Sequence, residues 1–162
     1  GVIEMQYNFV HMTQSYAEEI AYQWKYKGKY SFYDTTADEE DLAEFLDPKT
    51  WDRTFAVLNE DNELIGFYSY TFQEEVMWIG FGLKPDLTGQ GLGADFIRAG
   101  IEHGIEHFDY QKDIIMLAVA EFNQRAIKLY KKLDFKTIEK YDQPTNGGVY
   151  EFRKMKKILN FN

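Results

Sequence analysis

The sequence contains no cysteine, which excludes disulfide bonds and any nucleophilic thiolate supplied by the protein itself. It has no apolar run close to the roughly 18 residues that mark a membrane-spanning helix. No basic segment followed by an apolar one opens it, as a secretory signal would. The sequence therefore predicts a cytoplasmic protein that does not insert into a membrane.

The chain has fewer positive charges than negative ones, with 18 lysine and arginine residues against 27 aspartate and glutamate residues. Its 162 residues carry a net charge of −9, and 44% of them are apolar. Such apolar content is typical of a folded globular chain, and the length suits a single domain, residues 1–162, with a sizeable core. The acidic balance argues against nonspecific binding to nucleic acid and fits a cationic partner, such as an amine or a basic peptide.

The most informative stretch, residues 78–108, changes from an extended apolar pattern to a helical one. Between the two patterns lie Pro85 and then Gly89, Gly91 and Gly93. In a strand–glycine loop–helix turn, backbone N–H groups converge at the positive end of the helix dipole and form a site for an anion such as phosphate. The alternative is a tight turn without a ligand, because the pattern is neither the P-loop nor the dinucleotide fingerprint.

Periodicity and turn residues predict seven strands, at residues 3–10, 54–59, 64–72, 75–84, 113–120, 135–141 and 149–155. Four helices are expected: one capped by Thr13, one at 37–46 capped by Thr36, one after the glycines, and one at 122–133. The apolar run at 113–120 is typical of a strand buried on both faces. Pro144 and the residues 146–148 are expected to join the last two strands.

Two further features have competing interpretations. The segment 24–34 is dense in aromatic residues, which could pack onto the core, form a wall of a substrate pocket, or do both. His103 and His107 stand four positions apart on the long helix, a spacing that can bind zinc. Their surroundings do not form the HExxH motif, so we expect a solvated polar face and predict no metal.

A second motif, EFNQRAIKLYKKLDF, spans residues 121–135. Its Asn-x-x-Ala-x-x-Leu-Tyr pattern, with the proline and glycines upstream, resembles the GNAT superfamily of acyl-CoA N-acyltransferases over essentially the whole chain. This resemblance implies an α+β fold: a mixed, mostly antiparallel sheet of about seven strands flanked by about four helices. Two positions depart from the motifs, Thr88 where the family has a long basic or amide side chain and Asp134 where it has glycine. Aspartate tolerates a left-handed backbone better than most residues.

The resemblance also implies acetyl-CoA as the cosubstrate. The fourth and fifth strands would separate, and the pantetheine arm would bond to the backbone of Phe81 and Leu83. Asn123 matches the family asparagine whose amide contacts this arm. The pyrophosphate would lie on the amides of the glycine loop, namely Thr88, Gly89, Gly91, Gly93 and Ala94.

An amine that attacks a thioester must be neutral, the developing oxyanion needs a donor, and the leaving thiolate benefits from a proton. By resemblance Tyr130 is the general acid (a buried core tyrosine is the alternative), and the Leu83 N–H is the leading oxyanion donor. In ribosomal-protein N-terminal-alanine acetyltransferases, which both motifs resemble, a glutamate at the spacing of Glu75 is the base. Glu74 would replace it if a bulge exchanged the two faces, and both are exposed turn acids in the alternative interpretation.

The sequence thus predicts an N-acetyltransferase that moves an acetyl group from acetyl-CoA directly to a primary amine, either a protein N-terminus or a small cationic amine. The alternative from another class is a non-catalytic acyl-CoA-binding module of the same fold, with a regulatory or interaction role. A transferase of longer acyl chains is a third interpretation. A homodimer is compatible with the aromatic content of 17%.

Overall fold

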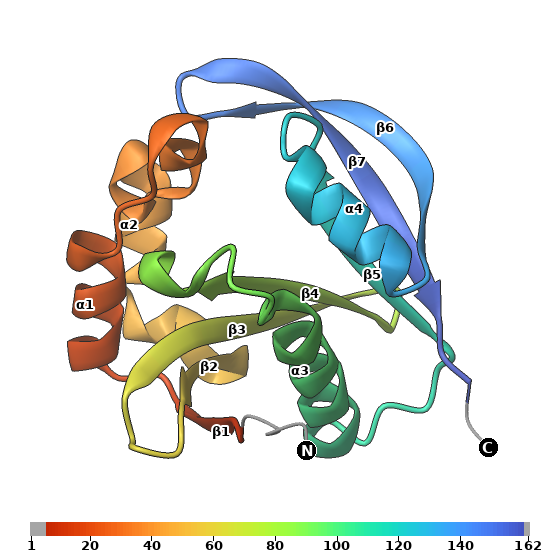
Figure 1. Cartoon of the computed structure of the whole chain (residues 1–162), viewed down its shortest axis with the longest axis horizontal. Helices are drawn as coiled ribbons and strands as arrows, with labels where there is room; N and C mark the ends of the chain where they lie inside the picture. The colour runs from red at the N-terminus through yellow and green to blue at the C-terminus, as the bar shows by residue number, and fades with distance from the viewer. Residues whose placement is uncertain (1–5, 161–162) are drawn as a thin grey trace. The chain divides into compact units, whose positions relative to one another are not determined.

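The computed structural model describes residues 6–160 (Figure 1). The strands in this range are β1 (Asn8–His11), β2 (Thr54–Leu58), β3 (Leu64–Gln73), β4 (Val76–Leu83), β5 (Ile114–Ala120), β6 (Phe135–Thr145) and β7 (Gly148–Ile158). The α-helices are α1 (Gln14–Gln23), α2 (Glu39–Phe45), α3 (Gly93–His107) and α4 (Gln124–Lys132). Short 3₁₀ helices are η1 (Gly28–Tyr33), η2 (Thr35–Ala37), η3 (Pro48–Arg53) and η4 (Pro85–Leu87).

The strands form a seven-stranded sheet in the order β1-β2-β3-β4-β5-β7-β6. The pairs β1–β2, β2–β3, β5–β7 and β6–β7 are antiparallel. β4 pairs in parallel with β5 through Met77–Ile115 and Trp78–Met116, near the beginning of both strands. The predicted α+β fold with a mixed, mostly antiparallel sheet is therefore confirmed.

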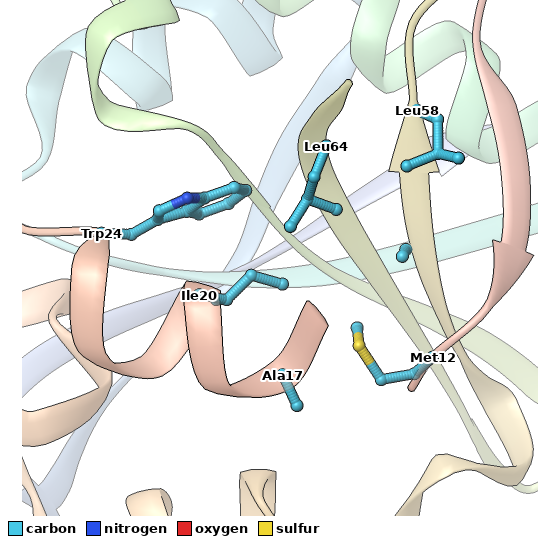
Figure 2. Close-up of a cluster of buried hydrophobic side chains, with 7 residues drawn as sticks. Met12, Ala17, Ile20, Trp24, Leu58 and Leu64 are labelled. Carbon is cyan, nitrogen blue, oxygen red and sulfur yellow. The ribbon is translucent and has the colours of Figure 1, made fainter. Parts of the chain in front are cut away.

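The chain divides into two compact units, one of the residues up to 69 together with 81–99, the other of 70–80 together with the residues from 100 onward. In the first unit, α1 buries its apolar face on β2 and β3. Ala17, Ile20 and the following Trp24 meet Leu58 and Leu64 in one buried cluster (Figure 2). This helix begins where the sequence predicts, because the side chain of Thr13 accepts a hydrogen bond from the Tyr16 amide at 3.2 Å.

The second unit is built on β5, which is buried along most of its length, as the apolar run predicts. β7 pairs with β5 on one side and with β6 on the other, and β6 and β7 form the long blue ribbon of Figure 1. Tyr110 ties the beginnings of two strands together. Its hydroxyl accepts from the Met77 amide at 3.1 Å and donates to the Ile114 carbonyl at 2.5 Å.

The predicted cap of α2 was wrong. Asp38, not Thr36, caps this helix, and its carboxylate accepts from the amides of Glu40 at 2.9 Å and Asp41 at 3.1 Å. Thr36 lies in η2, where its hydroxyl contacts the Lys25 ammonium. Aspartate is a better cap than threonine here, because its charged acceptor also interacts favourably with the positive end of the helix dipole.

Other boundaries differ at element ends. The first strand begins at Asn8, while positions 3–5 of the prediction lie outside the described residues. α4 begins at Gln124 rather than 122. β6 and β7 continue past their predicted ends, so that Pro144 pairs with Val149 inside the ribbon. Proline is tolerated there because β6 is the last strand in the order and so occupies an edge position.

The turn between β3 and β4 is made by Glu74 and Glu75, both in the left-handed conformation with φ of 52° and 68°. β4 therefore begins at Val76 and not at Glu75 as predicted. Two consecutive positive φ angles favour asparagine and glycine in such a hairpin turn. A left-handed backbone costs other residues about 1–2 kcal/mol each, so this hairpin carries local strain.

We predict that the double variant Glu74→Asn, Glu75→Gly has a free energy of unfolding about 1 kcal/mol or more above that of the native protein. Urea unfolding followed by tryptophan fluorescence measures the difference. The control is Glu74→Gln, Glu75→Gln, which removes both charges and keeps the strain. Equal stability of the two double variants would contradict the strain argument.

Candidate functional site

The turn from β4 into α3 lies in the first unit. After η4, the backbone is left-handed at Gly89, with φ of 76°, and at Gly91, with φ of 79°, and α3 begins at Gly93. A Cβ atom on Gly91 would meet no heavy atom within 4 Å. The backbone conformation, rather than lack of space within the chain, is thus what requires glycine at this position.

The first backbone N–H groups of α3 point out of the N-terminal end of the helix. Within residues 6–160, the first amide of this helix to donate a backbone hydrogen bond is that of Phe96, to the Leu92 carbonyl at 3.0 Å. A helix leaves its first amides without intrahelical partners, and they form a site for an anion. Residues 89–94 are exposed or half-buried. This geometry fits the predicted pyrophosphate contacts of Gly89, Gly91, Gly93 and Ala94, which stay predictions.

Thr88 forms hydrogen bonds within the loop. Its hydroxyl donates to the Pro85 carbonyl at 2.7 Å, and its amide approaches the same oxygen at 3.3 Å. The side-chain amide of Gln90 donates to the Asp86 carbonyl at 2.6 Å. These bonds brace the turn, so Thr88 shapes the loop, and its predicted contact with phosphate stays untested.

The end of β4 is held from several sides. The ring of Phe81 stacks on Tyr68 at a centroid distance of 5.1 Å. The Lys84 amide donates to the Ile65 carbonyl at 2.8 Å, and the Leu83 carbonyl accepts from the Tyr26 hydroxyl at 2.8 Å. No pattern in the sequence indicates this last bond, because its partners stand 57 positions apart.

Asn123 and Tyr130 belong to the second unit. Asn123 is the N-cap of α4, and its side-chain oxygen accepts from the Ala126 amide at 3.2 Å. Tyr130 lies further along the same helix with 9% of its surface exposed, and its ring centroid is 6.0 Å from that of Phe135. Asp134, the last but one residue of the motif, has a φ of 70°, which is the left-handed conformation that aspartate tolerates.

Glu75 is an exposed acid in a turn, as the alternative interpretation of this residue expects. Its side chain is 86% exposed, and its carboxylate lies 3.7 Å from the Lys112 ammonium. The role of base stays a prediction for this residue.

The rings of His103 and His107 stack at 5.4 Å, and within residues 6–160 no group of three or more histidine or acidic side chains could hold a metal ion.

An ion pair that the sequence did not indicate involves Glu121, the first residue of the second motif. Arg153, 7% exposed, donates to both carboxylate oxygens of Glu121 and to the Thr137 hydroxyl. The hydrogen bonds from Arg153 hold the pKa of the Glu121 carboxyl below its usual value. The pair joins the end of β5, two residues before Asn123, to β6 and β7.

A model of the acetyltransferase (GNAT) family matches residues 15–135, which include the glycine loop and the whole second motif. The chain belongs to this family. The predicted enzyme class, an acetyltransferase, is thereby confirmed. GNAT acetyltransferases use acetyl-CoA and amine acceptors. Among the described residues of this GNAT chain, no helix is long and apolar enough to cross a membrane.

Solved structures support the assignment of the GNAT fold. A GNAT acetyltransferase from Bacillus anthracis is 15% identical, with a TM-score of 0.69, and 94% of each chain is covered. Mutant forms of the spermidine/spermine N-acetyltransferase SpeG from Vibrio cholerae are 17% identical, with the same TM-score and coverage. At such identities the likeness is one of fold. A comparison with curated proteins finds no match.

We predict that Glu121→Gln lowers the free energy of unfolding by about 1–2 kcal/mol at pH 7, because it leaves a buried guanidinium without its charged partner. The folded-state pKa of Glu121 is depressed, so this contribution is present above the ordinary glutamate pKa of about 4.3 and is lost as the pH falls through the folded value. Urea unfolding at pH 7 and pH 3 should show the difference from the native protein shrinking at the lower pH.

The control is Glu139→Gln, which breaks the exposed pair with Lys154 at 3.0 Å. Exposed pairs contribute little, so this variant should change stability by less than Glu121→Gln at pH 7. A Glu121→Gln deficit that is the same at both pH values would contradict the account of this pair.

Proposed function

We propose that this GNAT protein transfers the acetyl group of acetyl-CoA directly to a primary amine. The observation that carries the proposal is the glycine turn, where two left-handed glycines lead into the N-terminus of a 15-residue helix. The pyrophosphate of acetyl-CoA is the dianionic group that such a terminus suits. A chain without cysteine has no thiol to carry the acetyl group, which favours transfer in one step.

In this proposal the amine nitrogen attacks the thioester carbonyl, the carbon–sulfur bond breaks, and CoA leaves as a thiolate. The Leu83 N–H donates to the developing oxyanion, and the Tyr130 hydroxyl gives a proton to the sulfur. Phe81 and Asn123 contact the pantetheine arm. The proton lost by the amine goes to Glu75, directly or through water. The separation of β4 and β5 that the family resemblance implies, and a single-domain organisation, stay predictions.

In this proposal the acceptor molecule is cationic or neutral rather than acidic. The net charge of −9 supports a cationic acceptor. A protein N-terminus, as in the ribosomal-protein alanine enzymes, and a polyamine are both candidates. A cytoplasmic location and a homodimer also stay predictions.

The test is CoA release from acetyl-CoA with a panel of polyamines, amino acids, aminoglycosides and peptides with free N-termini. The chain has no cysteine, so a thiol reagent detects only CoA. Release that depends on one class of amine supports the proposal and identifies the acceptor. Tight acetyl-CoA binding with no release across the panel would favour the non-catalytic acyl-CoA-binding module.

We predict that Gly91→Val raises the Kd for acetyl-CoA at least tenfold. A β-branched residue resists a φ of 79°, and its methyl groups would occupy the space in front of the helix amides. Titration calorimetry measures the affinity. The matched control is Gly147→Val, whose φ is 77° and whose Cβ would also meet nothing within 4 Å, in the turn between β6 and β7. Equal acetyl-CoA affinity in the two variants would remove the loop from the binding site.

We predict that Tyr130→Phe lowers kcat at least tenfold, since general acids contribute about 10²–10⁴-fold, and leaves the Kd for acetyl-CoA within about twofold. Tyr70→Phe is the control, because it removes the hydroxyl of another buried tyrosine, which donates to the Gly100 carbonyl at 2.6 Å. An undiminished kcat in Tyr130→Phe would exclude the acid role. The hairpin variant Glu74→Asn, Glu75→Gly tests the base in the same assay, since full activity would exclude Glu75.

A further inference from the structure

The aromatic segment 24–34 forms a closed loop with hydrogen bonds of its own. The Tyr26 amide donates to the Asp34 carboxylate at 2.8 Å, which joins the two ends of the loop. Inside it, the Tyr30 amide donates to the Lys27 carbonyl at 3.2 Å and the Asp34 amide to the Ser31 carbonyl at 3.0 Å. These bonds give the loop a defined conformation of its own, and the buried Trp24 anchors its first residue in the core.

Tyr26 links this loop to the end of β4. Its hydroxyl donates to the Leu83 carbonyl at 2.8 Å, and its ring is part-buried. Burial raises the pKa of the Tyr26 hydroxyl well above its usual value, with the charge of Asp34 adding to the effect. The phenol is therefore a neutral donor throughout the pH range of an assay.

The Tyr26 bond is made to a peptide group whose N–H is already hydrogen-bonded. The peptide between Leu83 and Lys84 accepts the Tyr26 hydroxyl at its carbonyl and donates its N–H to the Ile65 carbonyl at 2.8 Å. Pro85 follows and keeps Lys84 extended, with ψ of 135°. A carbonyl oxygen accepts two hydrogen bonds, so the Tyr26 bond by itself does not exclude a ligand amide from the Leu83 oxygen.

We propose that Tyr26 is a positioning residue for acyl transfer: its hydroxyl fastens the 24–34 loop to the Leu83 end of β4, so that loop and strand end present the amine to the thioester as one rigid wall. This inference rests on the proposed function, which places the thioester beside Leu83. It gives the aromatic segment the role of a substrate wall in addition to the core packing of Trp24. Rigid placement of a reactant lowers the barrier because its orientation is fixed before reaction.

The test compares Tyr26→Phe with Tyr70→Phe, each of which removes one phenolic hydroxyl bonded to a backbone carbonyl. Both should lower the melting temperature by similar amounts. For the best amine of the panel, Tyr26→Phe should lower kcat/KM about tenfold below Tyr70→Phe. Its Kd for acetyl-CoA should stay within about twofold of the native value. A kcat/KM equal to that of Tyr70→Phe would overturn the proposal, as would a loss confined to acetyl-CoA affinity.

Amide hydrogen exchange provides a readout that does not depend on activity. In Tyr26→Phe the amides of Lys84 and residue 26 should exchange several-fold faster than in the native protein, while Tyr70→Phe leaves both unchanged. Unchanged exchange would overturn the fastening role even in an active enzyme. A native protein that releases no CoA with any amine, but shows the faster exchange in the variant, would contradict the proposed function and leave the fastening of the loop established.

Discussion

The way in which β4 turns into α3 is the constraint on which the first unit depends. Two left-handed glycines, Gly89 and Gly91, reverse the chain so that α3 begins with its amides directed away from the helix body. Such a turn has little stability of its own, because glycine loses more conformational entropy than any other residue on folding. The surrounding residues must therefore hold both ends of the turn. The first unit has contacts at the α3 end and at the β4 end that do this.

On the helix side, Phe96 packs against Tyr68 at 5.0 Å, and the Tyr68 hydroxyl donates to the Phe96 carbonyl at 2.9 Å. Gly66 makes this packing possible, since a Cβ there would lie 2.5 Å from the Phe96 ring. On the strand side, the Leu83–Lys84 peptide is held by Ile65 and Tyr26. The second unit presents its candidate residues in a similar way. Asn123 caps α4, and at the other end the Lys157 ammonium donates to the Leu133 carbonyl at 2.7 Å.

Local signals in the sequence were sufficient for much of the fold. The Thr13 cap, the buried β5 and the left-handed Asp134 depend on neighbouring residues only, and each was predicted correctly. Two of the errors arose where the local signal was ambiguous or missing. Thr36 and Asp38 are both good caps, and the hairpin turn at Glu74 and Glu75 lacks the asparagine and glycine that usually mark one.

Contacts between distant residues could not be predicted from one sequence. Tyr26 and Leu83 stand 57 positions apart, and Glu121 and Arg153 stand 32 apart. Each residue alone resembles an ordinary core tyrosine or surface charge. The resemblance to the family motif, by contrast, indicated Asn123 and Tyr130, and the structure has Asn123 at the N-cap of α4 and Tyr130 within this helix.

The central claim is that the amides at the beginning of α3 receive the pyrophosphate of acetyl-CoA. The most direct test is an NMR titration of the ¹⁵N-labelled native protein with acetyl-CoA, which follows every backbone amide at once. The account predicts that the amides of Gly89, Gly91, Gly93 and Ala94 shift downfield and saturate together, as amides do on bonding to a phosphate. Saturable binding that leaves these four amides unshifted would contradict it.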